Sequence, residues 1–454
     1  MAKHEHFNMK NREQFFKKCA QLGVSIPYSE NMEVYHNSVK IGHVEAPNAL
    51  AVLPMEGCDS NADGSPSDLV RRRYERFFLG GAGLIWWEAN AVVEEGKANE
   101  LQMMLNKQNK GAFSDLISNL KTVTVKKYNH TPVSILQLTH SGRYSRPRGD
   151  RGIPIIAQHD PILDKRMGID SDYPLCTDEY LKDLVGSYVE SALLAQEVGF
   201  DGVDVKACHR YLLSELLASH TRGGEYGGTF ENRVRLLLEI IRSIKTACGE
   251  HFIVACRFNI FDAHPYPYGF GCAKDDMWVF DEEEPIKLVE ALVESGVSLL
   301  SNSAGNPYYI YPQVTRPFDL SSEGIPVPDE HPLESIERLF SFTELIQRHS
   351  KGIPVVGNGY TWLRQFIAPV GSANLQKGAC AFVGLGRSSF AYPDAPREIL
   401  QKGGLDPKKC CVSCSKCTQI MRDHGRTGCV IRDNKVYAPL YMEARQKAEK
   451  RRSE

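Results

Sequence analysis

The C-terminal part of the chain carries cysteines at a spacing that can bind a metal centre. Cys411, Cys414 and Cys417 are each separated by two residues, and a fourth cysteine follows after eleven more, at Cys429. Thiols this close can surround one centre from a short stretch of backbone. The tight triplet favours an iron–sulfur cluster over structural zinc, because zinc sites more often use two separated pairs; ordinary free cysteines are a third interpretation. The adjacent Cys410 leaves open whether it or Cys411 is the first ligand.

Arg257 is a second residue with a chemical implication, because it lies near the end of the apolar run 252–259. A buried guanidinium requires an anion or several hydrogen-bond acceptors. The electron-rich edge of a cofactor would supply them. An ion pair with Asp204 or Glu88 would do so as well, and the sequence leaves both interpretations open.

Eight short apolar runs recur along the chain with helical patterns between them, as in a sheet of buried parallel strands. The helical pattern is clearest over 178–198, where Thr177 can cap the start and Gly199 can end the helix. Alternating strands and helices predict an α/β protein with a (β/α)8 TIM barrel, and a doubly wound sheet is the alternative. The eight runs are 49–55, 83–90, 133–140, 202–207, 252–259, 297–304, 353–359 and 379–386.

Two strand-like stretches, 33–40 and 42–46, precede the first run and predict a hairpin that closes the bottom of the barrel. We therefore divide the chain into an N-terminal extension (1–35), a barrel (36–400) and a cysteine-rich, cluster-binding segment with a basic tail (401–454).

Active sites of such barrels lie at the C-terminal ends of the strands. After the last two runs, the turns 357–359 and 384–387 contain glycines, which expose backbone N–H groups, and a short helix can begin there. Barrels commonly bind phosphate at this place, and Arg387 adds a cation.

Two long loops, 261–285 and 306–319, are rich in aromatic residues. Loops of this length often cover a binding site, so their rings could enclose a flat apolar substrate, or they could pack on themselves. The rings are Tyr266, Tyr268, Phe270, Trp278, Tyr308, Tyr309 and Tyr311.

The composition is that of a globular protein, with 42% hydrophobic residues, 24% charged residues and a net charge of −2. This balance gives no indication of nucleic-acid or anionic-membrane binding. No stretch approaches the roughly 18 apolar residues of a membrane helix, and the polar N-terminus does not resemble a signal peptide. Thirteen cysteines without such a signal predict a reducing cytoplasm.

Five stretches, in the order of the chain, resemble the Old Yellow Enzyme family, and specifically its iron–sulfur branch. The run from Gly199 to Arg235 is the most specific of them. The resemblance extends from about residue 36 to about residue 432, and it includes the cysteine segment, whose spacing departs slightly from that of the reductases. The five stretches are 38–55, 83–92, 135–143, 199–237 and 382–396, and the strand that holds Arg257 also follows in the family's order.

The resemblance implies that FMN binds at the barrel mouth. It assigns the isoalloxazine ring to five residues and the phosphate to three others. The ring residues are Pro54 and Met55 through their backbone, Ala89 at the ring edge, Gln137 at the pyrimidine and Arg257 near N1 and O2. The phosphate residues are Gly359, Gly386 and Arg387.

The resemblance also places the substrate motif at 206–211, where relatives have H-A-A-H-G-Y or H-S-A-N-G-Y. It implies that Tyr211 gives a proton to the substrate and that His209 hydrogen-bonds the substrate carbonyl. Lys206 replaces the first histidine, so it could polarise that carbonyl, pair with a substrate carboxylate, or form a salt bridge with Asp204 or Glu215. Arg210 replaces the glycine, and we expect it to crowd the same wall.

These features predict a flavin-dependent oxidoreductase that reduces an activated C=C bond of a small enone or enoate, with a 4Fe-4S cluster as electron relay. No G-x-G-x-x-G motif follows the cysteines. We therefore expect electrons from NAD(P)H at the flavin, or from a partner protein through the cluster. The alternatives are an amine or C–H dehydrogenase of the trimethylamine dehydrogenase type, a lyase in which Lys206 forms a Schiff base, and a zinc-stapled binding protein. The sequence leaves the oligomeric state open, a homo-oligomer included.

Overall fold

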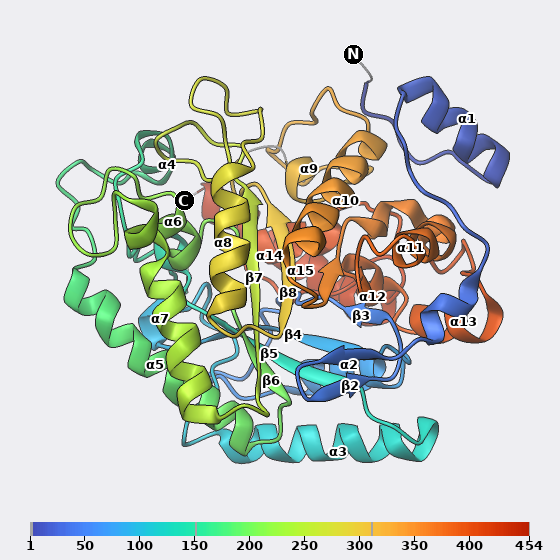
Figure 1. The fold of residues 1–454 in the computed structure, drawn as a ribbon, viewed down its shortest axis with the longest axis horizontal. Helices are drawn as coiled ribbons and strands as arrows, with labels where there is room; N and C mark the ends of the chain where they lie inside the picture. Colours follow the sequence, from blue (N-terminus) through green and yellow to red (C-terminus); the bar gives the residue numbers. More distant parts are fainter. Residues whose placement is uncertain (1–2, 150–151, 310–311, 454) are drawn as a thin grey trace.

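A parallel sheet closed into a barrel forms the centre of the protein (Figure 1). The computed structural model describes residues 3–149, 152–309 and 312–453. All eight predicted strands are present, and the doubly wound alternative is wrong because the last strand pairs with the first, with Val383 beside Leu50. Around the barrel, the strands are β3 (Leu50–Val52), β4 (Leu84–Ala91), β5 (Val133–Thr139), β6 (Gly202–Val205), β7 (Ile253–Phe261), β8 (Leu299–Ala304), β9 (Val355–Gly357) and β10 (Phe382–Leu385).

The strands are apolar throughout because both of their faces are covered. In β4, Leu84 and Trp86 pack inside the barrel, whereas Ile85 and Trp87 pack outward into the core beneath the helices. This alternation follows from the period of two in a strand.

Helices connect the strands and cover the outside of the barrel (Figure 1). None of those in the described ranges has the length and apolar character needed to cross a membrane. The α-helices are α1 (Arg12–Leu22), α2 (Asp68–Phe78), α3 (Lys110–Tyr128), α4 (Pro161–Met167), α5 (Asp178–Glu197), α6 (Leu212–Leu217), α7 (Phe230–Cys248), α8 (Glu283–Glu294), α9 (Pro312–Thr315), α10 (Pro332–His349), α11 (Ile367–Gln376), α12 (Arg387–Ala391), α13 (Ala395–Lys402), α14 (Lys416–Arg422) and α15 (Asn434–Ser453). The 3-10 helices are η1 (Met32–His36), η2 (Glu94–Gly96), η3 (Gly142–Tyr144) and η4 (Tyr360–Phe366).

The boundaries of α5 follow the local sequence as predicted. The Thr177 hydroxyl accepts a hydrogen bond from the Tyr180 N–H at 3.1 Å and caps the helix. Gly199 follows the end of the helix in a left-handed conformation, with φ 99°.

The predicted hairpin is present as β1 (Val39–Ile41) and β2 (Val44–Ala46), and it closes the bottom of the barrel. Ile41 and Ala46 are fully buried against residues from the N-terminal halves of the barrel strands. The strand predicted over 33–40 is wrong in its first half, where η1 forms instead. The Asn31 side chain accepts from the Glu33 N–H and begins this turn.

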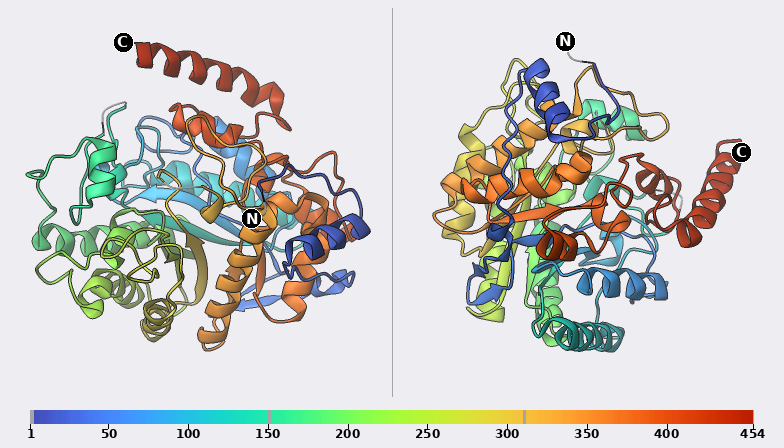
Figure 2. Two further views of the ribbon diagram at one scale, coloured as in Figure 1. Left: turned by 90° about the horizontal axis from the view of Figure 1, so that it is seen from above. Right: turned by 90° about the vertical axis from the view of Figure 1, so that its right-hand side faces the viewer.

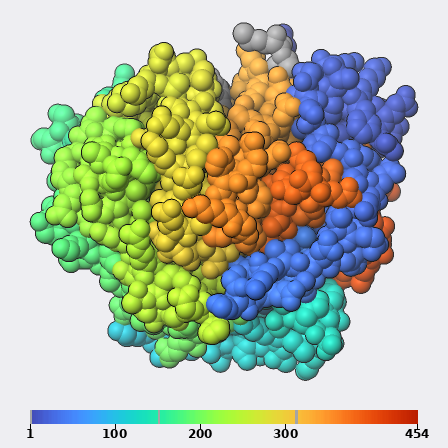
Figure 3. All heavy atoms as spheres, in the orientation of Figure 1, coloured from blue at the N-terminus to red at the C-terminus, as the bar shows by residue number. Residues whose placement is uncertain are grey.

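The N-terminal segment lies along the surface of the last third of the barrel, where Figure 3 shows it as a continuous blue band against orange residues. Phe15 of α1 is fully buried there and stacks on Phe366, with the ring centroids 4.8 Å apart. Burial of this ring accounts for the ordered contact of α1 with the barrel.

The C-terminal segment packs against one side of the barrel, and α15 is its outermost element (Figure 2). The carboxylate of Asp433 pairs with two arginines of α2, Arg72 at 2.7 Å and Arg76 at 2.5 Å. The Thr427 N–H donates to the Gly57 carbonyl at 2.6 Å. These contacts hold the cysteine-bearing segment next to the end of β3.

Replacing Ile41 with alanine should leave a cavity under the barrel and lower the free energy of unfolding by about 2–5 kcal/mol. Urea denaturation followed by tryptophan fluorescence measures this. The exposed Lys40 in the same strand is the control, because Lys40→Ala should change stability by less than about 0.5 kcal/mol. Equal effects of the two substitutions would show that the hairpin does not close the barrel.

Candidate active site

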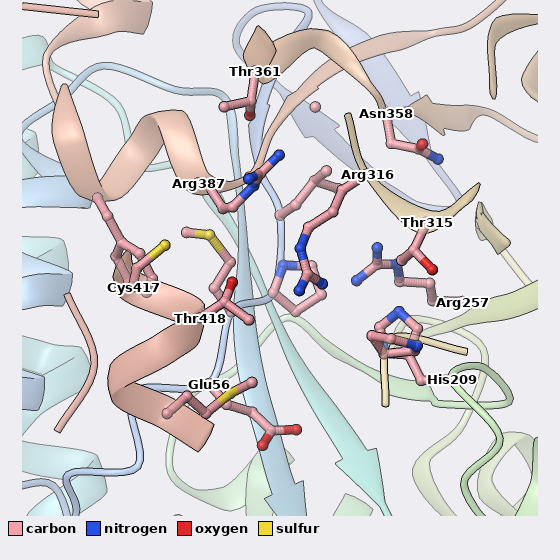
Figure 4. A pocket seen from close by; sticks show the side chains of 18 of the residues that line it. Glu56, His209, Arg257, Thr315, Arg316, Asn358, Thr361, Arg387, Cys417 and Thr418 are labelled. Atoms are coloured by element: carbon pink, nitrogen blue, oxygen red, sulfur yellow. The ribbon is translucent and has the colours of Figure 1, made fainter. Parts of the chain in front are cut away.

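A cavity opens at the C-terminal ends of the barrel strands, and it encloses about 1130 Å³ when its part open to solvent is included. Figure 4 shows side chains from several strand ends and loops pointing into this space. Eleven predicted site residues line it: Pro54, Met55, Gln137, Lys206, His209, Tyr211, Arg257, Gly359, Gly386, Arg387 and Cys417. Ala89 does not; it is buried in β4, where its carbonyl accepts from the Gln102 side chain at 3.2 Å.

A buried carboxylate, Asp204, organises the floor of this cavity. It accepts hydrogen bonds from the Gln137 amide at 2.6 Å and from the Trp86 indole at 2.9 Å. Its second oxygen accepts from the Arg257 backbone N–H at 2.8 Å. Burial raises the pKa of Asp204 to about 6, against the lowering effect of these donors. The Gln137 side chain is therefore held in one orientation.

Arg257 does not form the ion pair that the sequence allowed. Asp204 contacts its backbone, and Glu88 pairs with Arg73, which also binds Asp59 at 2.6 Å. The buried Nε of Arg257 has no hydrogen-bond partner within the described chain. A guanidinium in this state fits the interpretation in which a bound group supplies the acceptors.

Two further arginines lie at the same end of the cavity. The buried Nη1 of Arg387 has no partner in the described residues, while its Nη2 donates to the Pro317 carbonyl. Arg316 also faces the cavity, and burial together with the positive charges of Arg387 and Arg422 lowers its pKa to about 9. Figure 4 shows Arg257, Arg316 and Arg387 directed into a common space. Such a concentration of positive charge attracts an anion.

The glycine turns after β9 and β10 have the predicted form. Gly359 is left-handed with φ 92°, and α12 begins at Arg387. A Cβ at Gly384 would lie 2.3 Å from the Gly357 carbonyl oxygen, so only glycine fits. The turns thus leave backbone and a guanidinium facing the cavity, which suits a phosphate group.

Lys206 lies beside a carboxylate that the sequence analysis had not assigned a role. Its ammonium is 3.3 Å from Glu56 Oε1 and 3.9 Å from the ring centroid of Tyr211. The predicted pairing with Asp204 or Glu215 is wrong, because Asp204 binds the donors described above and Glu215 pairs with Arg143 at 2.9 Å. Glu56 directly follows Pro54-Met55 at the end of β3, and that position was its only signal in the sequence.

His209 and Tyr211 form the wall of the cavity opposite Arg387. His209 Nε2 is 2.9 Å from the Ser303 hydroxyl, and burial with the nearby Lys206 charge holds the pKa of the imidazole well below its usual range. The Tyr211 hydroxyl is 2.7 Å from that of Tyr308, and burial raises the pKa of both phenols. The imidazole and both phenols are therefore neutral at pH 7.

Arg210 does not crowd this wall as expected. Its side chain turns into the protein and pairs with Asp262 at 3.0 Å and Asp160 at 3.3 Å. Its backbone has φ 60°, the left-handed conformation that a glycine adopts without strain. The two ion pairs stabilise this conformation and keep the cavity open.

Of the two aromatic loops, only 306–319 lines the cavity. It contributes Tyr308, which stacks on Tyr144 with the ring centroids 4.3 Å apart. In the loop 261–285, Phe270 is buried in the core and Trp278 is half exposed, away from the cavity. Tyr311 lies outside the described residues.

The four predicted thiols line a second, smaller cavity of about 360 Å³. Among the described residues, no three His, Cys, Asp or Glu side chains lie close enough to hold one metal ion. Cys410 does not line this cavity; it is buried elsewhere, and its thiol donates to the Asp406 carbonyl at 3.4 Å. The two cavities share Cys417, Arg387 and Phe390 as a common wall.

Comparison with protein families agrees with this arrangement. Residues 36–270 match the NADH:flavin oxidoreductase / NADH oxidase family. The chain belongs to that family. The predicted resemblance is confirmed at the level of the family.

Two curated relatives illustrate the family's range. The chain is 27% identical over 381 residues to an NADH oxidase of Thermoanaerobacter brockii, covering 83% of this chain and 52% of the relative. It is 25% identical over 420 residues to a cinnamate reductase of Clostridium sporogenes, covering 88% and 58%. The chain thus spans little more than half of each of these relatives.

Solved structures share the fold. A 2-naphthoyl-CoA reductase in complex with 2-naphthoyl-CoA superimposes with a TM-score of 0.69 at 18% identity, covering 91% of this chain and 58% of that one. Histamine dehydrogenase from Rhizobium sp. 4-9 superimposes with a TM-score of 0.62 at 20% identity, covering 82% and 48%.

Removing the buried charge of Asp204 should change how stability depends on pH. Because its pKa is about 6 in the folded protein and about 3.9 when unfolded, the folded protein binds the extra proton. Stability from this group is therefore lost as pH rises from 4 through 6. The free energy of unfolding of Asp204→Asn, compared with that of wild type, should increase by on the order of 2 kcal/mol between pH 4 and pH 7. This holds whatever the pH-independent effect of the substitution on stability is.

Urea denaturation at pH 4, 5, 6 and 7 measures this difference. The exposed Asp115 of α3 provides the control, because Asp115→Asn should follow the wild-type pH dependence. A pH-independent difference between wild type and Asp204→Asn would contradict the raised pKa.

Proposed function

We propose that this flavin-dependent oxidoreductase binds FMN and reduces the activated C=C bond of an α,β-unsaturated carbonyl compound, and that its four C-terminal thiols bind a 4Fe-4S cluster. One observation carries the proposal. Three guanidiniums that form no ion pair with a carboxylate of the described residues line the same cavity as His209 and Tyr211, and that cavity shares Cys417 with the four-thiol cavity.

The residues of the mouth fit FMN. Arg387 and the turns at Gly359 and Gly386 would hold the phosphate. The Nη1 of Arg387 has no hydrogen-bond partner within the described residues, and the turns expose backbone N–H groups that bind anions. Arg257 and Gln137 would contact the N1, O2 and pyrimidine side of the ring. Pro54 and Met55 would lie along the ring through their backbone. When bound, FMN supplies a hydride from N5 to the substrate β-carbon.

The wall residues complete the reduction. The neutral His209 is fixed by Ser303 and can donate a ring N–H to the substrate carbonyl oxygen, where negative charge develops. Tyr211 remains protonated at neutral pH, so it can give its proton to the α-carbon. Tyr308 lines the cavity beside it, with its ring stacked on Tyr144, and an aromatic ring held in this way suits a planar conjugated substrate.

The spacing of the thiols favours a cluster over zinc. Zinc sites more often use two separated pairs of cysteines, whereas three of these cysteines are each two residues apart. All four thiols line one cavity of about 360 Å³. The wall shared at Cys417 would let electrons pass between cluster and flavin, with NAD(P)H or a partner protein as the donor.

The name of the Clostridium relative, cinnamate reductase, supports an unsaturated carbonyl substrate. The lyase alternative is less well supported, because a Schiff base requires a neutral amine and the Lys206 ammonium is paired with Glu56.

The first test is purification without oxygen, followed by a visible spectrum and quantification of FMN, iron, sulfide and zinc. One FMN with about four irons and four sulfides per chain supports both cofactors. A protein that retains one zinc and no flavin, from a preparation shown to keep bound cofactors, overturns the proposal.

Cys411→Ser should abolish most of the iron content while FMN stays bound, because this thiol lines the cavity. The neighbouring Cys410 offers a matched control, and Cys410→Ser should keep the iron content of wild type because its thiol lies outside the cavity. Iron and sulfide analysis of both variants measures this. Loss of iron in Cys410→Ser but not in Cys411→Ser would show that Cys410, rather than Cys411, is the cluster ligand.

Tyr211→Phe should keep FMN bound and reducible by dithionite, but slow the reduction of trans-cinnamaldehyde by about 10²–10⁴-fold. Stopped-flow absorbance at the flavin band measures reduction and reoxidation separately. Unchanged reoxidation by the substrate would remove Tyr211 from the role of proton donor.

A further inference from the structure

One carboxylate oxygen in the cavity contacts both an ammonium and the phenol of Tyr211. Glu56 Oε1 lies 3.3 Å from Lys206 Nζ and 3.5 Å from the Tyr211 hydroxyl. The ammonium also lies over the Tyr211 ring, 3.9 Å from its centroid. The three groups come from the ends of β3 and β6 and the turn that follows β6, so the barrel brings them together rather than the local sequence.

The other hydrogen-bond partner of Tyr211 is a second phenol. The Tyr211 hydroxyl contacts that of Tyr308, whose pKa is also raised. Tyr308 stacks on Tyr144, and the Tyr144 hydroxyl accepts from the Asn306 amide at 2.7 Å. A phenol passes on a proton at neutral pH only by becoming a phenolate, which burial disfavours. This side therefore cannot supply Tyr211 with a proton.

The proposed function consumes one proton from Tyr211 in each turnover, so the resulting phenolate must be protonated again before the next one. Tyr211 itself is 1% exposed. Lys206 and Glu56 both line the cavity, which water fills once the product has left. Glu56 is the carboxylate that contacts the phenol, and Lys206 contacts that carboxylate, so the two groups offer a proton path to the phenolate.

We propose that Glu56 and Lys206 form a proton relay that reprotonates Tyr211 between turnovers. The inference rests on the proposed function. The Lys206 ammonium gives a proton to the Glu56 carboxylate, and the carboxyl group so formed gives it to the Tyr211 oxygen. One N–H bond breaks, one O–H bond forms on the phenol, and Glu56 ends as a carboxylate. The neutral Lys206 then takes a proton from cavity water, the hydroxide left behind is neutralised by the buffer, and no electrons move.

The proton affinities match this direction. Burial and the Glu56 charge raise the pKa of Tyr211, so its phenolate is a strong base that takes up a proton readily. The ammonium over the ring also stabilises the phenolate while it exists. The inference assigns Lys206 to Tyr211 and leaves the substrate carbonyl to His209 alone.

Comparing single and repeated turnovers of Glu56→Gln tests the relay. In a single turnover, reduced enzyme begins with Tyr211 protonated, so reoxidation of the flavin by trans-cinnamaldehyde should stay within about 2-fold of wild type. Steady-state turnover should fall about 10- to 100-fold, since each cycle then waits for the proton. Glu56→Asp, or added imidazole as a small acid, should restore part of it.

Other results overturn the inference. If Glu56 has only a structural role, Glu56→Gln should slow the single turnover and the steady-state turnover equally. If Glu56 has no role, the substitution should slow neither of them. The exposed Glu13 of α1 is the matched control, and Glu13→Gln should behave as wild type in both assays.

A second measurement does not depend on activity, so it decides the relay even if wild type reduces no alkene and the proposed function fails. Ultraviolet titration of tyrosinate, with Tyr211→Phe subtracted, follows the Tyr211 phenol. The Glu56 charge raises the pKa of Tyr211, so Glu56→Gln should lower it, and Lys206→Met should raise it. An unchanged titration in Glu56→Gln means that the two groups are not coupled, and the relay is then excluded.

Discussion

Pairing of β10 with β3 is the constraint on which the rest of the structure depends. Leu385 lies beside Val52 in this register, and the next N–H along β3, that of Leu53, donates to the Leu385 carbonyl at 3.0 Å. Closure places the glycine turn at 384–386 against Pro54 and Met55, although more than three hundred residues separate them. An open sheet would leave these two ends at opposite edges. The anion-binding end and the strand that carries Glu56 thus face one another only because the sheet closes.

A second constraint is electrostatic. The mouth of the barrel holds Arg257, Arg316 and Arg387, and within the described residues none of them forms an ion pair with a carboxylate; Asp204 accepts from the floor donors and Glu56 pairs with Lys206. Partly buried cations without such partners lower the stability of the fold. An anionic cofactor bound here, as proposed, would stabilise the fold.

The fold could be predicted from the sequence because the signals that define strands and helix ends are local. Apolar runs of six to eight residues and cap residues such as Thr177 and Gly199 act through their neighbours in the chain, and the structure follows them. The partners of charged groups depend instead on distant elements. Lys206 pairs with Glu56 rather than Asp204, and Arg210 turns to Asp160 and Asp262, because barrel closure and loop packing decide which carboxylate is near. Nothing within a few residues of either cation indicates this.

The contacts of the C-terminal segment bear on how the protein is made. Asp433 and Thr427 hold the thiol segment to Arg72, Arg76 and Gly57, which belong to the first strand–helix unit of the barrel. That surface is synthesised early, whereas the thiol segment is synthesised only after all eight strands of the barrel. The thiols can therefore gather only on a chain whose barrel is already complete. Loading of a metal centre would then report that the barrel has folded, and chains with a misfolded barrel would expose their cysteines without capturing iron.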